Sequence, residues 1–496
     1  MTPLSDNLYS AQQSRQIEQL ALARYNLSGY DLMQRAAMAT ADYLKQRWPH
    51  ARRLLIVVGA GNNGGDGYAL ARIVGPHYDT VTLRCCAPIS PSSPDEAKKA
   101  YDDFLQAGLS VDIDDGSLPE ADLIIDALWG IGLNRGLSKK NQQLISKLNQ
   151  HSAPILALDI ASGLFADSGH CAHIAIRADV TLSFISKNLG LYTAHGPDHS
   201  GEIVLADLGL PHSLYAEIVP LATCCQLTNV APTHMTRHQA SHKGQFGHVL
   251  AIGGDKGLAG AIQMTALAAA RTGAGLTTIA THPSHANQLT SRQPELMCYG
   301  IEAPEQLAPL LDAATVLAIG PGLKDLIWAT TLVTSSVASG KPMVIDAGAL
   351  VVLEKQAIHC SSATILTPHP GEAAQLLNLS SQQVQADRVQ AVQQIQQRYG
   401  GVVVLKGAGT LIYDGQQLQL CPYGNPGMAS AGMGDLLTGI IASLVAQGIP
   451  PYQAACYGVT LHALAGDRAA KTLGEIGLLA LDLIPYLRQL RNSGTS

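Results

Sequence analysis

The chain is poor in charge and in aromatic rings, because 14% of its 496 residues are charged and 5% are aromatic. Its formal net charge is -6, so no broad positive field attracts nucleic acid or an acidic membrane. No apolar run reaches the roughly 18 residues of a membrane span, and the N-terminus MTPLSDNLYSAQQSRQIEQ lacks the apolar core of a signal peptide. We therefore expect a globular cytoplasmic protein with neither nucleic acid nor membrane as a partner.

The chain also lacks paired cysteine motifs and the common phosphate-binding P-loop. Its nine cysteines show no C-x-x-C spacing, and the adjacent pairs Cys85/Cys86 and Cys224/Cys225 suit disulfide geometry poorly. No G-x-x-x-x-G-K-[ST] sequence occurs either. We expect free thiols in a reducing compartment, and any bound nucleotide must be held by another kind of loop.

Apolar runs alternate with helical patterns in both halves of the chain. In the first half the runs lie at 53–58, 80–85, 122–126 and 154–159, with helical stretches near 65–74, 94–107 and 138–151. In the second half they lie near 247–252, 276–280, 315–319, 342–345, 363–366 and 401–405. This rhythm predicts an α/β fold with two doubly wound domains built on parallel sheets.

A segment with several prolines and little periodicity separates the two halves. It suggests domains at 1–215 and 241–496, joined by a linker at 216–240. The glutamine-rich stretch at 381–399 carries an apolar stripe that includes Val384 and Ile395. We interpret that stretch as one helix with a solvated amide face.

The stretch LLIVVGAGNNGGDGYALAR at 54–72 has the pattern of a strand, a glycine turn and a helix. Its glycines satisfy the G-x-G-x-x-G spacing, and such a turn presents backbone N–H groups to phosphate. A dinucleotide site also needs an acidic residue after the next strand, but Asp79 precedes that strand. Asn62, Asn63 and Asp66 instead add oxygen atoms that suit a hard cation or a polyhydroxyl ligand.

Two more acidic residues follow predicted strands, Asp126 in DLIIDALWGIGLNRG and Asp159 in ILALDIASGL. Because the carboxyl ends of parallel strands share one edge, we expect both to meet Asn63 and Ser162 in one crevice. Each carboxylate taken alone is equally well explained as a helix cap or a solvated loop residue. Three glycine-flanked strand ends together favour a functional site.

GAGNNGGDG, DALWGIGLNR, DIASGL and FISKNLGL jointly resemble the Rossmann-like NAD(P)HX epimerase domain over about residues 10–215. The resemblance implies a potassium ion held by Asn63, Asp126 and Ser162, with Asp159 as the candidate for proton transfer. Substrate contacts are implied for Asp159 and for two segments: Asn62, Asn63, Gly64, Gly65 and Asp66, then Gly130, Ile131, Gly132, Leu133, Asn134, Arg135 and Gly136. Ala161 departs from the proline common in the family, which relaxes the loop without removing a ligand group.

The most informative motif of the second half is GNPGMASAGMGDLLTGI at 424–440. Gly432, Met433 and Gly434 lead into a predicted helix, so their N–H groups and the helix dipole would converge on a transferring phosphate. Asp435 at the start of that helix is placed to accept a proton from an attacking hydroxyl. The alternative for Asp435 is a favourable charge in a first helical turn.

His369 in LTPHPGE and Lys406 in VVVLKGAGTLI also follow apolar runs, although either residue alone is more often structural. With HKGQFGHVLAIGGDKGLAGA and the G-M-G-D turn, these motifs resemble the ribokinase-like NAD(P)HX dehydratase over about residues 230–490. Substrate contacts are then implied for Ala261, Gly322, His369 and Asp435. ADP contacts are implied for Lys406, Gly407, Ala408, Gly409, Thr410 and Gly434, with Mg²⁺ beside the nucleotide. Ala431 stands where many relatives carry glycine.

The two resemblances together imply repair of NADHX and NADPHX, the hydrates of NADH and NADPH. The first half would epimerise their R and S forms, and the second would dehydrate the S form with ADP, giving NAD(P)H, AMP and phosphate. Two alternatives remain open: an ATP-dependent kinase of a small alcohol in the second half, and a non-catalytic nucleotide-binding module in the first. We also expect the protein to be a homo-oligomer.

Overall fold

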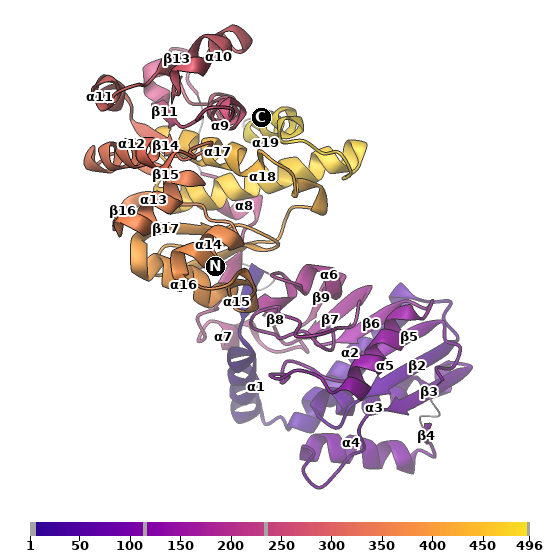
Figure 1. The fold of residues 1–496 in the computed structure, drawn as a ribbon. Helices are drawn as coiled ribbons and strands as arrows, with labels where there is room; N and C mark the ends of the chain where they lie inside the picture. The colour runs from indigo at the N-terminus through magenta and orange to yellow at the C-terminus, as the bar shows by residue number, and fades with distance from the viewer. Residues whose placement is uncertain (1–5, 113–116, 233–236, 494–496) are drawn as a thin grey trace. The chain divides into compact units, whose positions relative to one another are not determined.

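The computed structural model describes residues 6–112, 117–232 and 237–493. The chain divides into two compact units, Met1–Thr223 and Cys224–Ser496, each with a parallel sheet at its centre (Figure 1). The expected linker at 216–240 is not devoid of secondary structure, because it contains β10 (Ala222–Cys224) and α8 (Leu227–Val230). Its residues 233–236 lie outside the described ranges.

The N-terminal unit is built on a parallel sheet with the strand order β4-β3-β2-β5-β6-β7-β9. The strands are β2 (Arg53–Val58), β3 (Thr80–Cys85), β4 (Val111–Asp112), β5 (Leu123–Ala127), β6 (Ile155–Leu158), β7 (Val180–Phe184) and β9 (Glu202–Ala206). The order reverses between β2 and β5, and a ligand crevice lies at such a reversal in open α/β sheets. Two short strands outside this sheet, β1 (Asn7–Tyr9) and β8 (Lys187–Asn188), pair with each other in parallel.

Helices cover both faces of this sheet and bury the two alternating sides of its strands. Leu54, Ile56 and Val58 of β2 face one core, and Leu55 and Val57 face the other. Because both faces are covered, β6 and β2 from Leu54 onward are apolar on both sides and do not alternate with polar residues. The first core lies under α2 (Gly29–Arg47), α3 (Asn62–Val74) and α4 (Asp95–Gln106); the second lies under α5 (Lys139–Gln150). The unit also contains α1 (Ala11–Tyr25), α6 (Gly196–Ser200) and α7 (His212–Tyr215).

The sheet of the C-terminal unit runs in the order β13-β12-β11-β14-β15-β16-β17-β18-β19. It is parallel as far as β17 and antiparallel from there to β19. The strands are β11 (His248–Ile252), β12 (Leu276–Thr281), β13 (Met297–Gly300), β14 (Val316–Ile319), β15 (Met343–Ile345), β16 (Cys360–Leu366), β17 (Gly400–Leu405), β18 (Thr410–Tyr413) and β19 (Leu418–Cys421). Because these strands run in the same direction, the carboxyl ends of β11, β14, β15 and β17 and the loops that follow them lie at one edge of the sheet.

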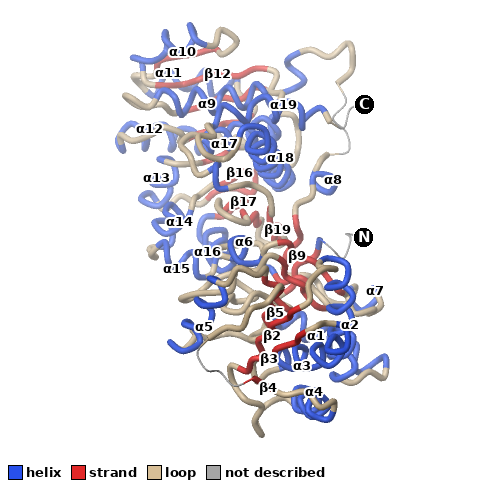
Figure 2. The backbone as a smooth tube through the Cα atoms, turned by 90° about the vertical axis from the view of Figure 1, so that its right-hand side faces the viewer, coloured by secondary structure: helices blue, strands red, loops and turns tan. Residues whose placement is uncertain are grey.

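The helices of this unit form a layer on each side of its sheet. Figures 1 and 2 both show α12 (Leu326–Ala338), α13 (Gly348–Gln356) and α14 (Pro370–Leu377) on the side of the strands away from α17 (Met433–Ala446) and α18 (Pro451–Leu473). The remaining helices are α9 (Ala259–Thr272), α10 (Ala286–Arg292), α11 (Pro304–Ala313), α15 (Ser381–Ala386), α16 (Arg388–Tyr399) and α19 (Leu483–Asn492). None of the helices in the described ranges is long and apolar enough to cross a membrane.

The prediction of a single helix at 381–399 is wrong in one respect. The segment forms two helices, α15 and α16, that meet at Asp387. The Asp387 carboxylate accepts a hydrogen bond from the Gln390 backbone N–H at 2.9 Å and so begins a new helix. The apolar stripe is present, because Val384 and Ile395 are both fully buried.

Candidate functional site

The first glycine turn is tighter than the sequence indicates, because α3 already begins at Asn62. Its N-cap is Gly61, which has no side chain to satisfy the first N–H groups of the helix. A Cβ atom on Gly64 would lie 2.0 Å from the Gly59 carbonyl oxygen, so only glycine permits this approach. Asn63 and Asp66 therefore stand in the first turns of α3, at the edge where β2 and β5 end.

Asp126 and Ser162 form a buried pair beside this turn. The Ser162 hydroxyl donates to Asp126 Oδ1 at 2.7 Å, and the Ser162 backbone N–H donates to Oδ2 at 2.8 Å. Both residues are fully buried. Burial raises the pKa of Asp126 to about 6 although these hydrogen bonds lower it, and no lysine or arginine pairs with it in the described chain. The pair is thus a buried acceptor group without a counterion.

Asn63 has no hydrogen-bond partner for either end of its buried carboxamide. Asn63 lies close to Gly130. A Cβ atom added to Gly130 would be 3.4 Å from Asn63 Cβ and 3.6 Å from Asn63 Cγ. Gly130 directly follows Trp129, whose backbone N–H donates to Ser162 Oγ at 2.9 Å. An orphaned amide near a buried carboxylate costs free energy unless a ligand satisfies both.

Asp159 lies in the turn after β6, on the same side of the crevice. Its φ angle is 67°, in the left-handed region that aspartate adopts more readily than most residues with a side chain. Asp159 Oδ2 accepts a hydrogen bond from the Ile131 N–H at 2.9 Å, which fixes the carboxylate against the loop after β5. Burial raises the pKa of Asp159 to about 6, against the lowering effect of this and another backbone hydrogen bond.

The rest of the expected substrate segments is less enclosed. Asn62 and the stretch from Asn134 to Gly136 are exposed, and Gly136 lies next to the His173 ring instead of the Asp159 carboxylate. Gly130 and Ile131 are the members of that loop that touch Asp159. The structure therefore brings part of the implied set together and leaves the remainder at the surface.

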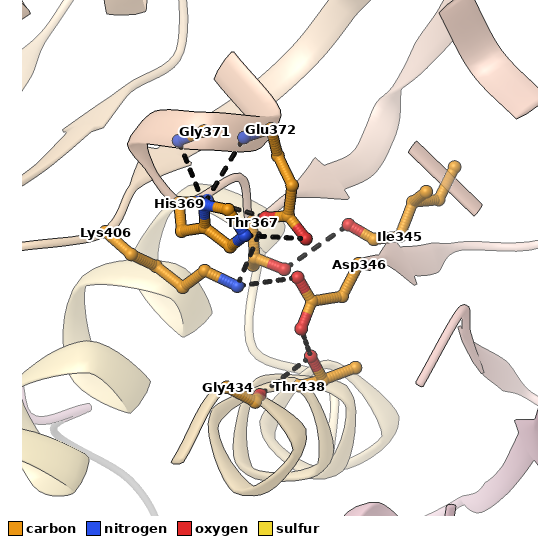
Figure 3. A network of polar contacts seen from close by, with 9 residues as sticks. All are labelled: Ile345, Asp346, Thr367, His369, Gly371, Glu372, Lys406, Gly434 and Thr438. Carbon is orange, nitrogen blue, oxygen red and sulfur yellow. Dashed lines mark hydrogen bonds and ion pairs between the residues drawn. The ribbon is translucent and has the colours of Figure 1, made fainter. Parts of the chain in front are cut away.

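The C-terminal unit holds a second polar cluster, centred on Lys406 after β17 (Figure 3). Lys406 Nζ lies 2.7 Å from Asp346 Oδ1, and the Thr438 hydroxyl donates to Asp346 Oδ2 at 2.9 Å. Burial alone would raise the pKa of Asp346, but the Lys406 ammonium lowers it below its usual value. Gly434 lies over this ion pair, since a Cβ there would be 3.2 Å from Lys406 Nζ.

Glu372 joins His369 to this ion pair. Its Oε2 lies 3.7 Å from Lys406 Nζ, and its Oε1 lies 3.5 Å from His369 Nε2. His369 is the N-cap of α14, where its Nδ1 accepts from the Gly371 N–H at 2.9 Å. Its side chain is 57% exposed, so the ring is open to a ligand as well as capping the helix.

Asp435 lies in the first turn of α17 beside the same charges. Burial is the largest cause of the raised pKa of Asp435, which is about 6. The Asp346 carboxylate is the next cause, and the Lys406 ammonium acts in the opposite direction. Its carboxyl makes no hydrogen bond or ion pair with any residue of the described chain. Gly432, the N-cap of α17, has a φ angle of 92° and no side chain to satisfy the helix's first N–H groups. An unpaired acceptor and unsatisfied donors therefore stand side by side.

Loops from neighbouring strands surround this cluster. Gly322, after β14, packs against the loop after β11, since a Cβ on it would lie 2.8 Å from the Leu258 carbonyl oxygen. Ala261 is in the first turn of α9, just past that loop. Lys406 and the residues up to Gly409 form the turn between β17 and β18, closed by a 2.9 Å bond from the Thr410 hydroxyl to the Gly407 carbonyl.

Known proteins match this chain over nearly its whole length. Family models for the YjeF-related protein N-terminus and for NAD(P)H-hydrate dehydratase match residues 29–190 and 249–489. A bifunctional NAD(P)H-hydrate repair enzyme of Coxiella burnetii is 42% identical over 486 residues, which are 98% of this chain and 99% of that protein. The enzyme of the same name from Escherichia coli is 39% identical, covering 98% of this chain and 94% of that one. This chain belongs to the bifunctional NAD(P)H-hydrate repair enzymes.

Solved structures place this repair-enzyme chain in the expected fold class. A ribokinase-like superfamily protein from Enterococcus faecalis V583 is 30% identical with a TM-score of 0.51, covering 54% of this chain and 94% of that one. An ADP/ATP-dependent NAD(P)H-hydrate dehydratase from Bacillus subtilis, co-crystallised with ATP and Mg²⁺, is 26% identical with a TM-score of 0.50, covering 55% and 99%. The predicted α/β class with a ribokinase-like second half is confirmed.

Three polar residues in the clusters of the two units were not predicted from the sequence of this repair enzyme. Asp346 follows the apolar run MVI, so the strand-end rule that singled out Asp126 applied to it as well. Glu372 is part of the quoted HPGE motif, in which only the histidine was assigned. Glu18 of α1 lies near Asp159 and Asp66, and nothing in its local pattern indicates this because α1 is remote in sequence from both.

Proposed function

We propose that this protein repairs hydrated NADH and NADPH at two separate sites. The N-terminal unit epimerises the R and S forms of NADHX and NADPHX. The C-terminal unit dehydrates the S form, with ADP as co-substrate. The observation that carries the dehydratase assignment is the unpaired Asp435 carboxyl at the uncapped start of α17. Phosphoryl transfer to a hydroxyl requires a group that accepts the hydroxyl proton and donors that bind the phosphoryl anion.

The chemistry of dehydration follows from these groups. Hydroxide is a poor leaving group, so the ring hydroxyl is first phosphorylated by the β-phosphate of ADP, which releases AMP. Asp435 takes the hydroxyl proton, and the N–H groups at 432–434 hold the transferring phosphoryl group. The phosphate then leaves this carbon and the neighbouring ring carbon gives up a proton to water, which restores the ring double bond. Lys406, held by Asp346, stands next to Gly434 and adds positive charge at this point.

Mg²⁺ fits beside the nucleotide in this proposal. Magnesium in phosphoryl-transfer sites takes one or two carboxylates and completes its shell with water and phosphate oxygens. Both oxygens of Asp346 are already used by Lys406 and Thr438. Glu372 Oε2 accepts from the His369 N–H at 2.7 Å, whereas its Oε1 has only the His369 ring, at 3.5 Å. Glu372 Oε1 is therefore the carboxylate oxygen that would hold the ion, which would neutralise charge on the phosphates.

Potassium fits the N-terminal site for a different reason. The Asn63 carboxamide has no partner, and Asp126 is a buried carboxylate without a counterion. With Ser162 they offer one negative charge and neutral oxygens, and the described residues contain no cluster of three or more His, Cys, Asp or Glu suited to a metal ion. A single charge favours a monovalent cation. A higher melting temperature in potassium than in sodium supports this ion, and equal values count against it.

We also propose that the protein acts in the cytoplasm and that it forms a homo-oligomer. All nine cysteines are free thiols, which suits a reducing compartment. Leu473, Ile476 and Leu479 expose 89, 101 and 62% of their surface, and such apolar exposure supports self-association. Light scattering of the purified chain would measure its oligomeric state.

The direct test mixes the purified full-length protein with both epimers of NADHX and ADP, and follows each species by chromatography. The proposal predicts loss of both epimers, recovery of NADH and release of AMP and phosphate. A stable phosphorylated product would instead identify a small-alcohol kinase. Recovery from one epimer alone would leave only the dehydratase.

A further inference from the structure

Helix α1 lies against the N-terminal active site, although the matched family segment begins only at residue 29. The Ser14 and Ser186 hydroxyls are 2.7 Å apart, and the Ala11 N–H donates to Asp167 at 2.6 Å. On the same helix, Arg15 Nη2 lies 3.6 Å from the position of a Cβ on Gly132. These contacts fix α1 beside the loop after β5, which also touches Asp159.

Glu18 follows Arg15 by three residues, so both side chains leave α1 on the same face. Glu18 is partly buried and makes no hydrogen bond or ion pair within the described chain. Burial raises its pKa, as do the Asp159 and Glu96 carboxylates, while Arg15 lowers it. Asp66 of α3 is the fourth charged neighbour, and its own pKa is raised well above the usual range by burial, Asp159 and Glu18.

The three carboxyls of Glu18, Asp66 and Asp159 thus interact without bonding to one another. Like charges gather in a partly buried site only where a cation, a ligand or a shared proton offsets the repulsion, and Arg15 supplies one positive charge against three carboxyls. The Asn63 carboxamide, 7% exposed and without a partner at either end, belongs to the potassium site proposed above and lies beside Gly130, which also adjoins Asp159. The carboxyls of Glu18, Asp66 and Asp159 are therefore groups whose mutual repulsion a bound ligand would relieve.

Epimerisation requires catalytic groups on both faces of the bound ring. Hydration of a ring double bond next to nitrogen puts the hydroxyl on the carbon bonded to that nitrogen. Inverting this carbon requires the hydroxyl to leave from one face and water to return on the other. One carboxyl fixed against the sheet cannot reach both faces of a bound ring, so the reaction needs a second group on another element.

We propose that Glu18 is this second catalytic group, acting on the ring face opposite Asp159; the proposal rests on the epimerase activity proposed above. In one direction the protonated carboxyl of Glu18 donates to the hydroxyl oxygen, the C–O bond breaks, and the ring nitrogen's electron pair stabilises the cation. Water then adds at the other face, and the Asp159 carboxylate takes its proton. The reverse direction exchanges the two roles, so no oxidant, reductant or other reactant is consumed.

The experiment measures interconversion of the purified epimers by full-length Glu18→Gln without ADP. We expect the turnover rate to fall by at least about 100-fold, as for removal of a general acid or base, with KM little changed. The pH profile of the residual rate should lose one of its two limbs. ADP-dependent recovery of NADH from the S epimer should stay at the wild-type rate, because it occurs in the other unit.

Glu96→Gln is the matched control, since Glu96 also raises the pKa of Glu18 but its carboxylate lies against Gly29 at the start of α2. It should retain wild-type epimerisation, and an equal loss in this variant would overturn the proposal. Formate should restore at least a tenth of the rate to Glu18→Ala if the carboxyl itself acts. Wild-type rates in Glu18→Gln, or a loss with a lowered melting temperature and no formate rescue, would contradict the role of Glu18. Absence of epimer exchange in the wild type would instead overturn the epimerase assignment.

Discussion

At the residue scale, Asp435 shows how burial can outweigh a helix dipole. A carboxylate in the first turn of a helix is normally stabilised by the N-terminal partial charge. Here burial and the Asp346 carboxylate dominate, and the pKa of Asp435 rises to about 6. A base with this pKa is ionised at neutral pH yet still binds a proton well, so dehydration should rise with pH through about 6 and then level off.

The same raised pKa predicts a stability effect. Unfolded aspartate titrates near pKa 3.9, so the folded state holds the proton more tightly and loses stability as pH rises from about 4 to about 6. Asp435→Asn removes this cost. The variant should therefore be more stable than wild type by roughly 1–2 kcal/mol near pH 7.5 and equally stable near pH 4, after allowance for solvent screening. Thermal unfolding at both pH values checks this, and a variant less stable near pH 7.5 would contradict it.

At the scale of elements, two glycines of α17 have different surroundings. A Cβ on Gly434 would lie 3.2 Å from the Lys406 ammonium and 3.4 Å from an Asp346 oxygen. A Cβ on Gly439, on the α9 side of the same helix, would lie 2.0 Å from the Thr265 carbonyl oxygen. The first contact is with a flexible side chain that can move, and the second is with rigid backbone.

The two substitutions to alanine should therefore fail differently. Gly434→Ala should displace Lys406, lower dehydration by about tenfold, and leave the melting temperature nearly unchanged. Gly439→Ala should force α17 away from α9 and cost about 1–3 kcal/mol of stability, with a normal rate per folded molecule. Parallel melting and activity measurements compare them. A similar loss of stability in both variants would show that Gly434 is only a packing residue.

Element boundaries show what periodicity can and cannot predict. The strands β2 and β3 have the bounds of their predicted runs, and β2 is apolar on both faces because both faces are buried. The break at Asp387 was missed, since a side-chain cap interrupts a helix without disturbing the spacing of its apolar residues. The start of α3 at Asn62 was missed because glycines disfavour a helix, and here the close approach of Gly64 to Gly59 outweighs that preference.

At the scale of the whole molecule, the sequence predicted polar residues at strand ends but only some of the contacts among their side chains. Asp126 and Ser162 were expected together, and two hydrogen bonds join them. The pairing of Lys406 with Asp346 spans 60 positions along the chain and depends on β15 and β17 ending at the same edge. Glu18 lies on α1, outside the sheet, so the expectation that functional residues follow strand ends does not predict it.

The central claim is that the two units hold two independent active sites. The most direct measurement follows each pure epimer by chromatography with full-length Asp159→Asn and Asp435→Asn, in the presence of ADP. We predict that Asp435→Asn interconverts the epimers but forms no NADH, and that Asp159→Asn forms NADH from the S epimer while the R epimer reacts no faster than without enzyme. Loss of both reactions in either variant, at unchanged melting temperature, would contradict two independent sites.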